Sequence, residues 1–275
     1  MVVGPDGAMW FAAFDGNSIG RITTSGSLTA YAIPTAACGP DSITLGPDGA
    51  LWFAELDGNQ IGRVTTNGVV TEFPITVAGS QPVGIAAGPD GALWFTQQNA
   101  QSIGRMTTAG AQTEYLLPTS SANPGAITSG PDGAMWFAEA GSGKVGRITM
   151  SGTITEYATP TSNSFPTSIV SGTDGALWFI ELNGNNVGRV AVSGQITEYP
   201  INKNIVGLAA IGLGPDGAMW FTQYQYYGRI TVLGSITEYA NTNVRGSDFG
   251  SVITGPDRAV WFTDRISNHV SRLSI

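Results

Sequence analysis

The side chains of this sequence that could do chemistry are those that do not recur in its repeated pattern. A carboxyl group of raised pKa can act as a general base, and carboxylate oxygens also hold hard cations such as Mg²⁺ or Ca²⁺. Asp41 and Asp248 are the candidates for proton transfer. The acidic residues outside the repeated pattern are Asp15, Asp41, Glu55, Asp57, Glu139, Glu181, Asp248 and Asp264.

A metal site is the second possibility that these carboxylates raise. Four of them stand three residues after a tryptophan and could ring one rim of the fold: Glu55, Glu139, Glu181 and Asp264. Neighbouring repeats would splay these positions apart, however, and the sequence has no DxDxDG-type loop. We therefore interpret the four as solvated charges and predict no metal ligands.

Aromatic and charged side chains that do not recur predict a binding surface. Tyrosines bury area at a low entropic cost, and scattered polar partners beside them are typical of binding surfaces. The alternative is that the three tyrosines only fill a shortened loop. The predicted binding residues are Asp41, Lys203, Tyr224, Tyr226, Tyr227, Arg245 and Phe249.

The elements that must position these side chains come from a repeat with a period of 42 or 41 residues. The repeat is marked by Trp10, Trp52, Trp94, Trp136, Trp178, Trp220 and Trp261, each followed by phenylalanine. In residues 82–115 a short apolar segment ends at the turn Gly88-Pro89-Asp90-Gly91, and three further short segments follow. No stretch has a sustained helical period, so each repeat is predicted to be a four-stranded antiparallel meander.

Seven such meanders predict an all-β fold, a seven-bladed β-propeller, in a single domain over 1–275. The blades are expected near 1–35, 36–77, 78–119, 120–161, 162–203, 204–244 and 245–275. We call the strands of a blade A to D from the channel outwards. The recurring Trp and Phe of strand B should pack between blades. The last blade should lack its outer strand, which would expose the edge of its strand C.

Other recurring residues are explained by the scaffold. An arginine in strand C is followed nine residues later by a glutamate in five repeats, for example Arg63 and Glu72. A two-residue C–D turn would place them opposite each other as a surface ion pair. The residues that do not recur fall mainly in B–C and D–A loops, which share one face of a propeller. The sequence therefore predicts one variable, acidic face around the channel mouth.

Composition limits the partners. The net charge is −8 and the pI about 4.5, which argues against nucleic acid and anionic membranes. No apolar run approaches the ~18 residues of a membrane span. Cys38 is the only cysteine, so no disulfide forms within the chain. The expected partner is a small molecule or peptide at the channel mouth, with the chain a monomer or weakly associated through the edge of blade 7. Localisation stays open between soluble, secreted and cytoplasmic.

The run GPDGALWF…NxIGRxTTxGxxTEYPLP, seen in variants at 88–118 and 46–75, resembles the virginiamycin B lyase (streptogramin lyase) family over essentially the whole chain. The resemblance implies a seven-bladed propeller and Mg²⁺-dependent opening of a cyclic depsipeptide by elimination at an ester. The family's two histidines match Ala209 and Gly250 here, and its nearby glutamate matches Asp248. The only histidine, His269, aligns with Gln60 at the start of a strand C.

Three possible functions follow from this resemblance and from the replacement of the family's two histidines. The first is a virginiamycin-B-lyase-like propeller that binds a ligand or protein without the elimination activity. The second is a divergent Mg²⁺-dependent carbon–oxygen lyase, in which Asp248 would be the catalytic base. The third is a near-regular scaffold or fragment with no evolved site. No cofactor is predicted beyond the Mg²⁺ that the lyase function would require.

Overall fold

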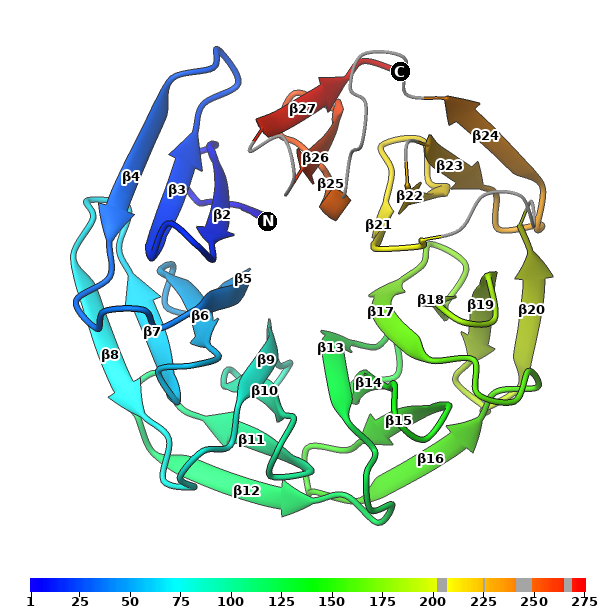
Figure 1. Cartoon of the computed structure of the whole chain (residues 1–275), viewed down its shortest axis with the longest axis horizontal. Coiled ribbons are helices and arrows are strands. Elements are labelled where there is room, and N and C mark those ends of the chain that lie inside the picture. The colour runs from blue at the N-terminus through cyan, green and yellow to red at the C-terminus, as the bar shows by residue number, and fades with distance from the viewer. Residues whose placement is uncertain (202–206, 225, 241–248, 265–268) are drawn as a thin grey trace.

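The chain forms seven antiparallel sheets arranged as blades around a central channel (Figure 1). The computed structural model describes residues 1–201, 207–224, 226–240, 249–264 and 269–275. Six sheets have four strands, and the last sheet has three. The predicted fold class is therefore confirmed, including the missing outer strand of blade 7. Among the described residues no helix is long and apolar enough to cross a membrane.

Within each blade the strands follow one another from the channel outwards. Blade 1 consists of β1 (Val2–Val3), β2 (Met9–Ala13), β3 (Ser18–Ile22) and β4 (Leu28–Ala32), and blade 2 of β5 (Pro40–Leu45), β6 (Leu51–Glu55), β7 (Gln60–Val64) and β8 (Val70–Pro74). Blade 3 consists of β9 (Pro82–Ala87), β10 (Leu93–Gln97), β11 (Ser102–Met106) and β12 (Gln112–Leu116), and blade 4 of β13 (Pro124–Ser129), β14 (Met135–Glu139), β15 (Lys144–Ile148) and β16 (Ile154–Ala158). Blade 5 consists of β17 (Pro166–Ser171), β18 (Ala176–Glu181), β19 (Asn186–Ala191) and β20 (Ile196–Pro200), and blade 6 of β21 (Ile211–Leu213), β22 (Met219–Gln223), β23 (Tyr226–Ile230) and β24 (Ile236–Ala240). Blade 7 consists of β25 (Phe249–Thr254), β26 (Val260–Asp264) and β27 (His269–Leu273).

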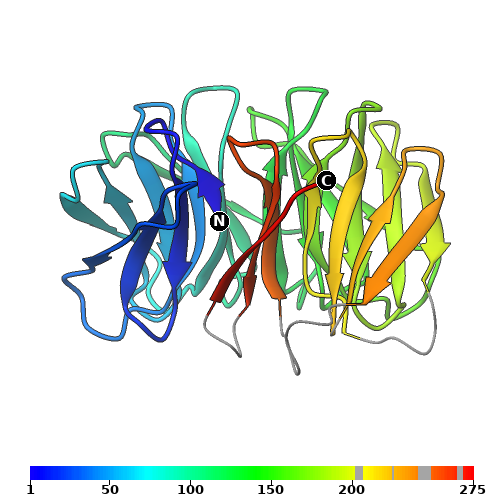
Figure 2. The same cartoon turned by 90° about the horizontal axis from the view of Figure 1, so that it is seen from above.

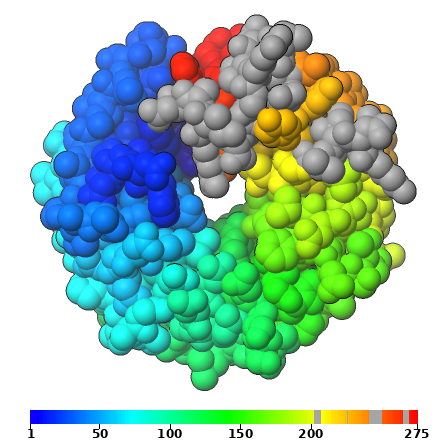
Figure 3. Space-filling model, in the orientation of Figure 1, coloured from blue at the N-terminus to red at the C-terminus, as the bar shows by residue number. Residues whose placement is uncertain are grey.

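The strands run between two opposite faces of the ring (Figure 2). Because neighbouring strands are antiparallel, the A–B and C–D turns lie on one face, and the B–C loops and D–A segments on the other. Figure 3 shows the channel opening at the centre of the ring. We call the face with the B–C loops and D–A segments the variable face.

The recurring aromatic residues form the cores between blades, as predicted. Trp52 of blade 2 packs in one cluster with Leu93 and Phe95 of blade 3, and Trp94 packs in the next cluster with Phe137. Phe95 lies across the backbone of β11, where a Cβ on Gly104 would come within 2.2 Å of the ring. Glycine is therefore required in strand C, because any side chain would displace the aromatic residue that joins two blades.

The predicted ion pair between strands C and D is wrong. Arg63 lies opposite Thr71, and Glu72 lies opposite Gly62. The reason is the C–D connection, which spans five residues between Val64 and Val70 and shifts the register by one. The arginine Nε instead donates to the aspartate of the A–B turn in all seven blades, over 2.5–2.7 Å.

Candidate functional site

Asp41, Ala209 and Gly250 occupy the same position of strand A in three blades. Each lies two residues before the aliphatic residue that pairs with the phenylalanine of strand B, as the pair Ile43–Phe53 shows in blade 2. The position lies at the end of strand A that meets the variable face. It holds a half-buried carboxyl group in blade 2, but no group that can transfer a proton in blades 6 and 7.

The tyrosines of blade 6 separate into exposed and packed residues. Tyr224 is 49% exposed at the end of strand B. Tyr226 begins β23 opposite Gln223 and is half-buried. The ring of Tyr227 stacks on Tyr239 with centroids 5.4 Å apart and contacts Phe262 of blade 7. Packing between two blades thus accounts for Tyr227, while Tyr224 presents its ring to solvent.

The other predicted site residues come from the D–A segments and strands A of blades 2, 6 and 7. Lys203, Arg245 and Asp248 lie outside the described residues. Phe249 begins β25 opposite Asp264, and only its backbone is described. Asp41 belongs to blade 2, which is not a neighbour of blade 6, so the structure does not bring it beside the tyrosines (Figure 1).

His269 lies where the sequence places it, at the start of a strand C. It is exposed and pairs in register with Asp264, as Gln60 pairs with Glu55 in blade 2. The imidazole is therefore on the third strand of blade 7, two strands from the channel.

Three glutamates that the sequence places on a solvated rim are fully buried. Glu55, Glu139 and Glu181 are each 0% exposed, and Asp264 at the same position is 3% exposed. The interpretation as solvated charges is therefore wrong. Strand B is covered on both faces along its whole length, and its last residue is covered as well. Two blades carry the neutral isostere at this position, Gln97 and Gln223, which was a signal available in the sequence.

Burial raises the pKa of each of these three glutamates to about 7. The carboxylate of strand D adds to the effect in each blade, as Glu198 does beside Glu181. Asn186 Nδ2 donates to Glu181 Oε2 over 2.7 Å, and Ser142 Oγ donates to Glu139 Oε2 over 2.8 Å, which oppose the rise. A pKa near 7 suits a general base, but a group enclosed between blades cannot reach a substrate. These glutamates are buried structural groups.

Cys38 has no nucleophilic character. Burial, together with the neighbouring Glu55, raises the pKa of its thiol to about 12. The described residues also contain no group of three or more His, Cys, Asp or Glu side chains that could hold a metal ion.

An apolar cavity of about 430 Å³ lies along the inner strands of blades 5 to 7. Its walls come from strands A: Ile169 and Val170 of β17, Ile211 and Leu213 of β21, and Val252 to Thr254 of β25. Val170 pairs with the tryptophan of strand B, and the residues that do so in blades 2 and 4 are Thr44 and Thr128. At this position blades 2 and 4 therefore carry a hydroxyl group where blade 5 carries an apolar side chain.

A ring of seven antiparallel blades, six of four strands and one of three, with the Trp–Phe cores described above defines a seven-bladed β-propeller. The model of the Virginiamycin B lyase family matches residues 1–273, so the chain belongs to this family. No curated protein matches the chain.

Solved structures give the same result. A streptogramin B lyase is 36% identical with a TM-score of 0.94, and the match covers 99% of this chain and 91% of that one. Virginiamycin B lyase from Staphylococcus aureus is also 36% identical, with a TM-score of 0.94 and coverage of 99% and 93%. A catalytically inactive histidine-to-alanine variant of that enzyme, with quinupristin, matches equally well. Hydrazine synthase of Kuenenia stuttgartiensis, 16% identical with a TM-score of 0.77, shares the fold alone.

Proposed function

We propose that this chain is a binding propeller of the virginiamycin B lyase family that lacks the family's elimination activity. The observation that carries the proposal is the inner-strand position shared by Asp41, Ala209 and Gly250. The resemblance assigns histidines to Ala209 and Gly250, and neither residue can accept a proton. His269, the only imidazole of the sequence, stands on strand C of blade 7.

The apolar cavity supports a ligand with an apolar part. Its volume of about 430 Å³ lies within the range of small-molecule sites, roughly 300–1,000 Å³. It lies along the inner strands of blades 5 to 7, which include the blade of the three tyrosines, although none of the predicted binding residues lines it. Its walls extend to Gly214, toward the A–B turns, so a ligand entering from the variable face would place its apolar part deep in the channel.

The inactive relative supports a proposal in which binding is separate from turnover. That variant carries alanine in place of a histidine and is named as catalytically inactive, yet it is described with quinupristin. A chain with Ala209 and Gly250 in place of the histidines fits the same behaviour.

Incubation with a type B streptogramin such as quinupristin and Mg²⁺ should leave the ring closed, because no imidazole stands at the inner-strand position. Mass spectrometry of the mixture checks this. A linear, dehydrated product formed at an enzyme-like rate would favour the lyase function, which the 36% identity to a streptogramin B lyase supports. Asp248→Asn would then be the first variant to test as the loss of the base.

A crystallographic fragment screen tests the binding site itself. Apolar fragments should collect against β17, β21 and β25, and Val170→Trp should displace them by filling the cavity. The matched variant Thr128→Trp, at the corresponding position of blade 4, should leave them bound. Fragments confined to the face of the A–B turns, with the channel and Tyr224 free of them, would contradict the proposed site.

A further inference from the structure

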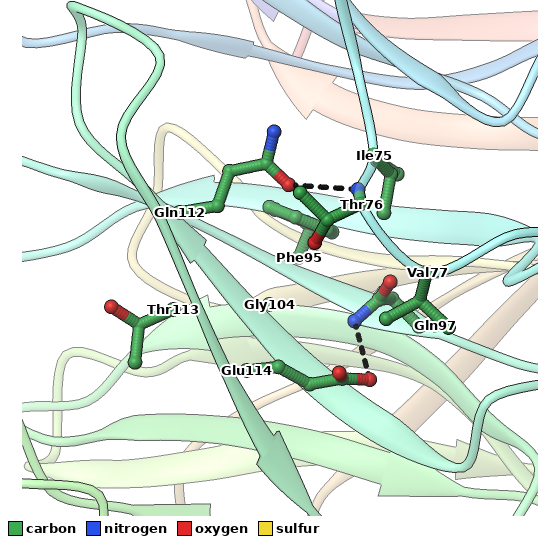
Figure 4. A pocket seen from close by; sticks show the side chains of 9 residues that line it. All are labelled: Ile75, Thr76, Val77, Phe95, Gln97, Gly104, Gln112, Thr113 and Glu114. Carbon is green, nitrogen blue, oxygen red and sulfur yellow. Dashed lines mark hydrogen bonds between the residues drawn. The ribbon is translucent and has the colours of Figure 1, made fainter.

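A second, smaller cavity lies between blades 2 and 3. It measures about 50 Å³ and is lined by the D–A segment Ile75, Thr76 and Val77, by Gln97 at the end of β10, and by Gln112 and Glu114 of β12 (Figure 4). None of these residues belongs to the site proposed above.

Among the polar groups that line this cavity are two acceptors, the amide oxygen of Gln97 and the carboxylate of Glu114. Gln97 is 1% exposed, and its Nε2 donates to Ser102 Oγ over 2.9 Å and to Glu114 Oε1 over 3.4 Å. Its buried Oε1 receives no hydrogen bond from any described residue. Figure 4 shows this oxygen on the side of Thr76, away from Glu114. A buried amide oxygen and a carboxylate together favour a ligand that is cationic and donates hydrogen bonds.

Blade 4 carries a cationic donor beside the equivalent carboxylate. Lys144 takes the position of Ser102, because each is the first residue of strand C and pairs with the last residue of strand B. Its Nζ donates to Glu156 Oε2 over 2.7 Å and to Thr119 Oγ1 over 2.6 Å. Glu156 is the counterpart of Glu114 in strand D. A primary ammonium group thus contacts the equivalent carboxylate in blade 4.

In blade 3, Glu114 Oε1 accepts from Ser102 Oγ over 2.7 Å and from Gln97 Nε2 over 3.4 Å, but the threonine donors that serve this carboxylate in other blades are missing. In blade 5, the backbone N and Oγ1 of Thr161 donate to Glu198 over 2.8 and 2.7 Å. In blade 2, the backbone N of Thr35 donates to Glu72 over 3.0 Å. Blade 3 has Val77 at the corresponding position, which carries no hydroxyl group. The neighbouring Thr76 N donates to Gln112 Oε1 instead, over 3.2 Å.

We propose that the cavity of blade 3 binds ammonium or a small primary ammonium ion such as methylammonium. The ion lies at the place that corresponds to the Lys144 ammonium group in blade 4. The ion donates to the Glu114 carboxylate and to Gln97 Oε1. A cavity of this size accepts an ion about as large as water, whose share of liquid volume is about 30 Å³. A quaternary ammonium ion is too large and has no hydrogen to donate.

Thermal unfolding with different chloride salts at equal ionic strength tests the proposal. Ammonium and methylammonium chloride should raise the Tm more than sodium, potassium or tetramethylammonium chloride, because a ligand bound only by the folded state stabilises it. Glu114→Gln should abolish the difference between the salts. Glu198→Gln removes the corresponding carboxylate of blade 5 and should leave the difference intact.

Tethering the ammonium group provides an independent test. Ser102→Lys should place an ammonium group in the cavity as Lys144 does in blade 4, raise the Tm by about 2–4 °C relative to Ser102→Met, and remove the response to ammonium. Conversely, Lys144→Ser should lower the Tm and make blade 4 responsive to ammonium. Equal shifts with ammonium, potassium and tetramethylammonium, or a Ser102→Lys variant no more stable than Ser102→Met, would overturn the proposal.

Discussion

Raising the pH from 4.5 to 8 is expected to destabilise the folded propeller by several kcal/mol. Glu55, Glu139 and Glu181 are buried, and their pKa is raised from 4.5 to about 7 in the folded state. The folded chain therefore holds more protons than the unfolded chain between these two values, so stability falls as pH rises through this window and levels off above pH 7. Each group contributes up to about 3 kcal/mol at 1.36 kcal/mol per pKa unit. Denaturant unfolding at a series of pH values measures the effect.

The aspartates of the A–B turns make the folded state less stable at low pH. Burial would raise their pKa, but hydrogen bonds from tryptophan and arginine hold it below its ordinary value, as in Asp90. All seven turn aspartates share this shift. Their contribution is present above pH 3.8 and is lost as pH falls through the lowered folded value. Stability should therefore be greatest near pH 4–5.

Glutamine variants separate the buried glutamates from the general effect of net charge. Gln97 shows the expected geometry, since its Nε2 donates to the strand D carboxylate as a protonated Glu181 would donate to Glu198. Glu181→Gln should match the wild type at pH 4 and exceed it at pH 8 by up to about 3 kcal/mol. Asp15→Asn changes the net charge equally at an exposed position outside the buried glutamates and is the matched control. A Glu181→Gln variant that follows the wild-type pH profile would show that this proton is not held by Glu181.

The fold could be predicted from the sequence because the residues that determine it recur in every repeat. The period of the tryptophans, the Gly-Pro-Asp-Gly turns and the short apolar runs predict four-stranded blades, and seven copies predict the ring. The packing of Trp52 against Phe95 between blades follows from the same pattern, because a strand covered on both faces must bury its aromatic residues. The ion-pair partner of the strand C arginine could not be predicted from the sequence, because it depends on a register difference of one residue. Arg63 faces Thr71 only because the C–D connection has five residues.

The candidate site was less predictable for a different physical reason. Charge alone suggested that Glu55 and Glu181 are solvated, since buried carboxylates are uncommon without partners. Their burial depends on the neighbouring blade and the D–A segment, which no local pattern describes. Tyr227 was similarly assigned to a surface, whereas its ring stacks between blades 6 and 7. The absence of imidazole at Ala209 and Gly250, in contrast, was visible from the turns alone, and the register of strand A confirms the equivalence of these positions.

Replacing Trp94 by alanine is expected to cost about 3–5 kcal/mol of unfolding free energy, because a fully buried indole leaves a cavity. The ring stacks on Tyr115 with centroids 5.6 Å apart, and the Arg105 guanidinium lies 5.9 Å from its centroid. Its Nε1 donates to Asp90 Oδ1 over 3.0 Å. Arg105→Ala should cost only about 1 kcal/mol, since its ion pair with Asp90 is partly exposed.

A double-mutant cycle decides which carboxylate Arg105 uses. Arg105 Nε lies 2.7 Å from Asp90 Oδ2, while Glu114 lies opposite Gly104. Arg105→Ala and Asp90→Asn should therefore couple, because removing either partner leaves the other without its charge. Arg105→Ala and Glu114→Gln should add without coupling. Coupling with Glu114 alone would restore the ion pair between strands C and D and would contradict the register. Asp90→Asn should also weaken the Trp94 hydrogen bond, so its cost should exceed that of Arg105→Ala: one carboxylate holds the turn, the indole and the guanidinium together.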